Sequence, residues 1–166
     1  MIHGPKHVIA GPGQESVWDY PRPPRLEKVS ETLVVSFAGM TIAETVRGCR
    51  VLETSHPPVY YFPVEDVQSQ FISTAAGSSF CEFKGVATYI SIRVGAEFSE
   101  RAGWTYLNPA SGFERLAGHL AFYASRVDEA WVGSEKVTPQ EGNFYGGWVT
   151  AKILGPFKGR DGTAGW

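Results

Sequence analysis

The clearest constraint on the fold is an alternation of side chains from Val86 to Val94. Successive side chains of a β-strand point to opposite faces of the sheet, so this pattern predicts a strand. A second alternation from Thr32 to Ala38, followed by Gly39, predicts another strand that enters a tight turn. The remaining apolar runs are short and are separated by many of the 19 glycines and 11 prolines. The chain is therefore predicted to be mainly β, with two packed, roughly orthogonal antiparallel sheets.

Helical signals are few, and we expect one or two short helices. Pro63 is followed by Glu65 and Asp66, a pattern typical of the first turn of a helix, which we expect to end near Phe71. Residues 111–114 match a capping box and predict a second short helix. The small residues 73–79 are expected to form a loop.

The length of 166 residues fits one domain with a sizeable core. Residues 1–31 are rich in proline, glycine and charge and are expected to form an extended N-terminal arm. Residues 32–143 are expected to form the β domain. Residues 144–166 are expected to form a glycine-rich C-terminal strap that packs on the same domain.

Composition argues against several partners. A net charge of −2 argues against nucleic acid, and no apolar run approaches the roughly 20 residues of a membrane span. The first residues contain no apolar signal region, so we expect a cytoplasmic protein. Cys49 and Cys81 form no CxxC pair, and the sequence contains neither HExxH nor a D-x-D pair. We therefore expect no metal and no cofactor; whether the two thiols are reduced or bridged stays open.

The segment 50–63, RVLETSHPPVYYFP, is expected to form a rigid corner between two strands. Pro57 and Pro58 exclude a helix there and force an extended path. Tyr60 and Tyr61 are expected to lie on opposite faces, one directed inward and the other outward. A stiff corner that also carries Glu53 is typical of the wall of a binding site.

A second group of polar residues lies in the segment 80–93, FCEFKGVATYISIR. Lys84 and Arg93 could together hold an anion, with Tyr89 as a hydrogen-bond donor. The alternative is a surface pair of Glu82 with Lys84 beside a core cysteine, Cys81. Several aromatic residues could form a cage for a flat or cationic ligand, or could simply be core: Trp104, Tyr106, Tyr123, Trp131, Tyr145 and Trp148.

Blocks of this sequence resemble a small bacterial family known as domain of unknown function 427. The blocks are RVLETSHPPVYYFPVEDV, CEFKGVATYISIRV, GWTYLNP, LAFYASRVDEAWVGSEKV and FYGGWVTAKILGPFKG, and they span about residues 15–166. The resemblance implies a compact β domain related to the β-tent folds, which include zinc-bearing relatives and the cereblon ligand-binding domain. The zinc knuckles of those relatives are absent here. The family's nucleotidyltransferase-like label finds no paired carboxylates in this chain to hold a metal.

We place the motif residues of the resemblance around one pocket: Glu53, Tyr60, Cys81, Lys84, Tyr89 and Trp104. The first hypothesis is a domain that binds a small molecule between its sheets through Glu53, Tyr60, Lys84, Tyr89, Arg93 and Trp104. The second is an enzyme acting on a small or nucleotide-like substrate. It would use Glu53 as acid/base and Cys81 or Lys84 as nucleophile or clamp. The third is a structural or protein-interaction module that forms a homodimer.

Overall fold

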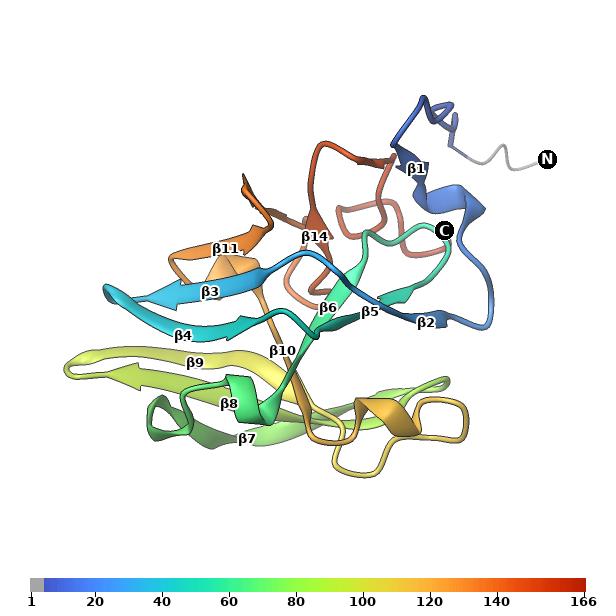
Figure 1. The fold of residues 1–166 in the computed structure, drawn as a ribbon. Helices are drawn as coiled ribbons and strands as arrows, with labels where there is room; N and C mark the ends of the chain where they lie inside the picture. Colours follow the sequence, from blue (N-terminus) through green and yellow to red (C-terminus); the bar gives the residue numbers. More distant parts are fainter. Residues whose placement is uncertain (1–4) are drawn as a thin grey trace.

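The computed structural model describes residues 5–166 and confirms a mainly β protein with packed antiparallel sheets (Figure 1). The larger sheet has seven strands, in the spatial order β2 (Arg25–Lys28), β5 (Cys49–Leu52), β6 (Val59–Pro63), β10 (His119–Phe122), β9 (Glu97–Thr105), β8 (Gly85–Val94) and β7 (Ile72–Cys81). The smaller sheet has four strands, in the order β12 (Glu135–Lys136), β11 (Glu129–Val132), β3 (Leu33–Phe37) and β4 (Met40–Thr45). The two alternations read from the sequence therefore form β8 and β3.

Two short pairings complete the described fold. β1 (Glu15–Ser16) runs parallel to β15 (Ile153–Leu154), and β13 (Thr138–Pro139) runs antiparallel to β14 (Trp148–Val149). The helical segments in residues 5–166 are 3₁₀ turns of three residues each: η1 (Val17–Asp19), η2 (Val64–Asp66), η3 (Ser69–Phe71), η4 (Glu114–Leu116) and η5 (Ala124–Arg126). None of the helices in this part of the chain is long and apolar enough to cross a membrane.

The main core lies between the two sheets, where β3 and β4 stack against β8 and β9 (Figure 1). Leu33, Val35 and Phe37 point into this core, as their alternation predicts, while Val34 and Ser36 are half-buried. Ile92 of β8 and Phe122 of β10 face them from the larger sheet. Burying apolar area of this kind supplies most of the free energy that holds the sheets together.

A second core covers the other face of the larger sheet. It contains Tyr61, Trp104, Phe113 and Leu116. Tyr60 faces the first core and Tyr61 faces the second, so both are buried. The expectation that one of these tyrosines points outward is therefore wrong: they do alternate, but the sheet is covered on both faces.

Two local expectations are also corrected. The helix expected from residue 63 to about 71 is two separate 3₁₀ turns, η2 and η3, because Val67 lies in extended backbone between them. Residues 73–79, expected to form a loop, belong to the edge strand β7, which pairs with β8 and is interrupted by an irregularity between Thr74 and Ser78. Small residues can form a strand there because the stronger strand β8 supplies the partner.

The two terminal segments pack against one another. The N-terminal segment contains β1 and the edge strand β2, and the C-terminal segment lies beside it in Figure 1. Trp18 Nε1 donates a hydrogen bond to the carbonyl of Pro156 at 2.9 Å, and the Trp18 ring contacts Trp166. The arm expected over residues 1–31 is thus part of the body from β1 onward.

Candidate functional site

A cavity of about 230 Å³ lies on the second core, rather than between the two sheets, where the pocket was expected from the sequence. Its walls come from five places: the corner between β5 and β6, the β7–β8 hairpin, the end of β9, Tyr123 after β10, and residues 140–146. Phe80 and Phe144 also line it, and these residues are 72% and 57% exposed, so they mark its mouth. The cavity thus collects segments that are up to 95 residues apart in the sequence.

Aromatic rings form the walls of this cavity. Tyr89 of β8 pairs across the sheet with Trp104 of β9, and the rings of Trp104 and Tyr123 lie 4.7 Å apart. Tyr145 closes the outer side and packs edge-on against His56, with ring centroids 4.6 Å apart. Flat apolar walls of this kind favour a flat ligand.

The outer wall is held in place by two residues that follow β10. Tyr123 Oη donates to the carbonyl of Phe144 at 2.9 Å, and Arg126 donates to the carbonyl of Asn143 at 2.9 Å. Gly146 is required here because a Cβ atom at this position would overlap the Trp104 ring. The close approach of backbone and indole therefore fixes one side of the cavity.

The corner after β5 brings Glu53 and His56 together. The backbone N–H of His56 donates to the carbonyl of Glu53 at 3.1 Å, and Ser55 between them has a left-handed φ of 72°. This turn places Glu53 Oε2 3.7 Å from His56 Nε2. The turn thus brings the Glu53 carboxylate and the His56 imidazole close together on the cavity wall.

Gln140 determines which nitrogen of His56 carries the proton. Its Oε1 accepts from the N–H of Gly147 at 3.0 Å, so its Nε2 must be the atom that donates to the Lys158 carbonyl at 2.6 Å. The same Nε2 lies 3.2 Å from His56 Nδ1, which therefore acts as the acceptor. A neutral imidazole with an unprotonated Nδ1 carries its proton on Nε2, beside Glu53.

His56 is neutral over the physiological pH range. Burial lowers its pKa to about 3, and the positive charges of Lys158, Lys84 and Arg22 act in the same direction. Its Nε2–H is consequently a fixed neutral donor. Glu53 Oε2, at 3.7 Å, is beyond hydrogen-bonding distance.

Lys84 ends the β7–β8 turn, directly before the positive-φ residue Gly85. Gly85 packs against the Asn108 carbonyl and the Ala110 nitrogen, and the Ala110 N–H donates to the Lys84 carbonyl at 2.8 Å. The lysine is only 9% exposed, yet no ion pair or side-chain hydrogen bond joins it to another residue in 5–166. Lys84 lines the cavity, and its ammonium group is not fully enclosed.

The two cysteines are free and differ in their surroundings. Cys81 is half-buried and lines the cavity. Cys49 lies in the second core, where burial raises the pKa of its thiol to about 11. Within residues 5–166, no group of three or more His, Cys, Asp or Glu side chains could hold a metal ion.

A family model described as a domain of unknown function, DUF427, matches residues 25–133. The chain belongs to the DUF427 family. The match runs from β2 to the end of β11 and includes Glu53, His56 and Lys84, whereas residues 140–146 of the outer wall lie beyond it. No curated protein matches the chain.

The DUF427 fold brings together most of the residues singled out from the sequence. Glu53, Cys81, Lys84, Tyr89 and Trp104 all line the cavity. Of the aromatic set, Tyr106, Tyr123 and Tyr145 also line it, whereas Trp148 is fully buried in the first core and Trp131 lies on β11 of the other sheet.

Two of the expected site residues lie elsewhere in this DUF427 chain. Tyr60 faces the first core and stacks on Trp148, at 5.3 Å, because it points to the opposite face of β6 from Tyr61. Arg93 lies four residues beyond Tyr89, near the far end of β8, and its guanidinium covers the Phe98 ring at 4.5 Å. Four residues of strand span about 13 Å, so Arg93 lies too far along β8 from Tyr89 to reach the cavity.

Two polar residues of the cavity, His56 and Gln140, were not among the expected site residues. His56 lies in the corner singled out from the sequence, and its spacing from Glu53 suits a turn that brings the two side chains together. Nothing in the sequence near Gln140 indicates its role, because its partner His56 is 84 residues away.

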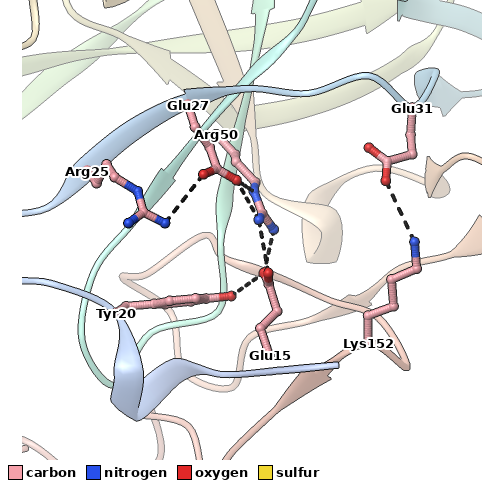
Figure 2. Close-up of polar contacts among 7 residues, drawn as sticks. All are labelled: Glu15, Tyr20, Arg25, Glu27, Glu31, Arg50 and Lys152. Carbon is pink, nitrogen blue, oxygen red and sulfur yellow. Dashed lines mark hydrogen bonds and ion pairs between the residues drawn. The ribbon is translucent and has the colours of Figure 1, made fainter. Parts of the chain in front are cut away.

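The DUF427 fold contains a second, larger cavity of about 520 Å³, between β2, β5 and the short strands near the termini. Figure 2 shows Arg50 between two carboxylates: it lies 2.6 Å from Glu15 and 2.6 Å from Glu27. Tyr20 Oη donates to Glu15 at 2.7 Å, and Lys152 pairs with Glu31 at 3.6 Å. The pKa of Glu15 is lowered, because hydrogen bonds from Arg50 and Tyr20 outweigh the opposing effect of burial.

Proposed function

We propose that this DUF427 chain binds a small molecule in the cavity of about 230 Å³. The observation that carries the proposal is a set of three polar groups without hydrogen-bond partners in residues 5–166: the Glu53 carboxylate, the His56 Nε2–H and the Lys84 ammonium. None of the three groups is fully enclosed, so each can reach solvent that enters the cavity. Two of them are charged, and hydrogen bonds to charged groups are about twice as strong as neutral ones, so a ligand that pairs with them would gain free energy.

The size of the cavity limits the ligand. Pockets that bind drug-sized ligands have volumes of about 300–1,000 Å³, whereas a dry cavity of about 150 Å³ is known to hold benzene. At about 230 Å³, this cavity has room for one ring with a small substituent. The walls of Trp104, Tyr123 and Tyr145 supply apolar contact area for the faces of such a ring.

A matched pair of substitutions on β7 tests the proposal. Ser79 lines the cavity, whereas the neighbouring Ser78 is exposed and points to the opposite face of the strand. We expect Ser79→Trp to fill the cavity and abolish binding of single-ring fragments, measured by ligand-observed NMR, and Ser78→Trp to leave it unchanged. Native mass spectrometry of the purified wild-type protein would identify a ligand that co-purifies. If the wild-type protein binds no fragment, or if both variants bind equally, the proposal fails.

A second candidate function is catalysis on the bound molecule, with Glu53 as acid/base. The observation that favours it is the position of Glu53 Oε2, 3.7 Å from His56 Nε2. His56 cannot serve as a base through Nε2, because this nitrogen carries the proton, so Glu53 is the candidate base. Cys81 and Lys84 line the same cavity and are the candidate nucleophiles. Conversion of a bound ligand by the wild-type protein, lost in Glu53→Gln while binding persists, would distinguish an enzyme from a binding domain.

A further inference from the structure

The charge around the cavity is unbalanced at its polar end. The lining contains one ammonium group, Lys84, and one carboxylate, Glu53. Two further cations, Lys158 and Arg22, act on His56 from outside the lining, and Lys158 Nζ lies 5.6 Å from the centre of the Tyr145 ring. Lys84 and Lys158 therefore place two positive charges at this end against the one carboxylate of Glu53, whereas Arg22 donates to a backbone oxygen of Trp166 at 3.1 Å.

Two of the three unpaired groups at this end, on Lys84 and His56, can only donate hydrogen bonds, and the third, the Glu53 carboxylate, can only accept them. An ammonium group has three donors and no acceptor. Gln140 occupies the acceptor nitrogen of His56, so only the Nε2–H donor remains available to a ligand. The Tyr123 hydroxyl donates its hydrogen bond to the Phe144 carbonyl, so it has no donor left for a ligand. Lys84 and His56 therefore require acceptor atoms from whatever fills the cavity.

We infer that the ligand is a small planar anion, an aromatic carboxylate whose oxygens face Lys84 and His56 and whose ring lies among Trp104, Tyr123 and Tyr145. This inference rests on the proposed function and names its ligand class. Carboxylate oxygens accept from an ammonium and an N–H together, and charge-assisted hydrogen bonds are about twice as strong as neutral ones. Gln140 is a positioning residue in this arrangement, because it acts on the ligand only through the tautomer of His56.

Glu53 gives the inference its sharpest prediction. Its carboxylate repels an anionic ligand and attracts a cationic one. Glu53→Gln keeps the shape and removes the charge, so it tightens an anion and weakens a cation. A role for Glu53 as the principal ligand contact would give the opposite sign for an anionic probe.

The test uses three probes of nearly equal shape: benzoate, benzamide and benzylamine. Binding to the full chain is followed by ligand-observed NMR and by the fluorescence of Trp104 in the cavity wall. We expect benzoate to bind most tightly, Lys84→Met to weaken it about tenfold or more, and Glu53→Gln to strengthen it. Lys136→Met, which removes an exposed lysine on β12 outside the cavity, serves as the control and leaves binding unchanged.

The outcomes separate the inference from the proposed function. Preferential binding of benzylamine or benzamide that is weakened by Glu53→Gln and blocked by Ser79→Trp overturns the anionic ligand and leaves the proposed function standing. Benzoate binding that is equal in Lys84→Met and Lys136→Met also overturns it. If no probe of any charge shows binding that Ser79→Trp blocks, the proposed function fails together with the inference.

Discussion

The two cavities of this protein differ in what their charged groups contact. In the larger one, Arg50 is held by Glu15 and Glu27, and Lys152 by Glu31 (Figure 2). In the smaller one, the Glu53 carboxylate, the His56 Nε2–H and the Lys84 ammonium have no hydrogen-bond partners within residues 5–166. Volume alone would favour the larger cavity as a binding site. Charge pairing favours the smaller, because only unpaired groups gain free energy from a ligand.

The comparison also separates stability from binding. The paired network joins the N-terminal segment to β2 and β5, so it contributes to folding. The unpaired groups cost folding free energy and are retained at the cavity. Substitutions in the paired network should therefore cost stability without changing fragment binding, and only substitutions in the smaller cavity should change binding.

The largest expected effect is on the paired network. The Arg50 side chain is only 16% exposed. Arg50→Met removes its guanidinium and leaves Glu15 and Glu27 without their shared partner. Breaking a fully buried pair costs about 3–5 kcal/mol, and partial exposure of both carboxylates reduces this to about 2–3 kcal/mol. Urea unfolding measures the loss, and fragment binding in the smaller cavity should be unchanged. A stability loss below about 0.5 kcal/mol would place the network among ordinary surface pairs.

The second-largest expected effect is a pH dependence of the free energy of unfolding, caused by His56 in the smaller cavity. The pKa of His56 is lowered to about 3 by burial and neighbouring cations, from 6.5 in the unfolded chain. Below pH 6.5 the unfolded chain therefore binds a proton that the folded chain does not, so stability falls as the pH falls from 6.5 towards 3. From pH 7.5 to pH 5 we expect a loss of about 2 kcal/mol, measured by urea unfolding.

The control for this pH effect is His56→Gln, which cannot take up a proton and should lose little stability over the same interval. The larger cavity responds in another window. The lowered pKa of Glu15 gives stability that is present above about pH 4.5 and is lost at more acidic pH. An equal loss at pH 5 in the wild type and in His56→Gln would show that His56 is not responsible.

The smallest expected effect has the opposite sign. Lys84→Met replaces an unpaired, buried ammonium by an apolar side chain of similar length, so the free energy of unfolding should stay constant or rise by up to about 1 kcal/mol. The same urea unfolding experiment measures it, with Lys136→Met as the exposed control. A loss of more than about 1 kcal/mol would mean that Lys84 is a paired structural residue, like Arg50, and would remove the distinction between the cavities.

Much of this architecture was accessible from local sequence patterns. The alternations of residues 32–38 and 86–94 predict strands because successive side chains of a strand point to opposite faces, and β3 and β8 are found there. The motif blocks of the family resemblance place Glu53, Cys81, Lys84, Tyr89 and Trp104 around one pocket, and all five line the cavity, whereas Tyr60, placed with them, does not. The β-tent relationship stays a prediction.

The remaining features depend on contacts between distant parts of the chain. Whether Tyr61 faces solvent is decided by Phe113 and Leu116, which cover it from more than 50 residues away. The tautomer of His56 depends on Gln140, and the strand status of residues 73–79 depends on the partner β8. Arg93 lies on the same strand as Tyr89, but its distance along that strand keeps it out of the cavity.

The outer wall formed by residues 140–146 comes from a different stretch of the chain than the charged groups of the cavity. Glu53, His56 and Lys84 lie inside the region that the family model matches, whereas Gln140 and Tyr145 lie outside it. Under the proposed function, a relative with a different sequence in residues 140–146 would keep the groups that meet the ligand's charge. It would lose the aromatic wall of Tyr145 and the Gln140 contact that fixes the His56 tautomer. Changes in this one segment would therefore alter ring preference and the hydrogen-bonding of His56 together.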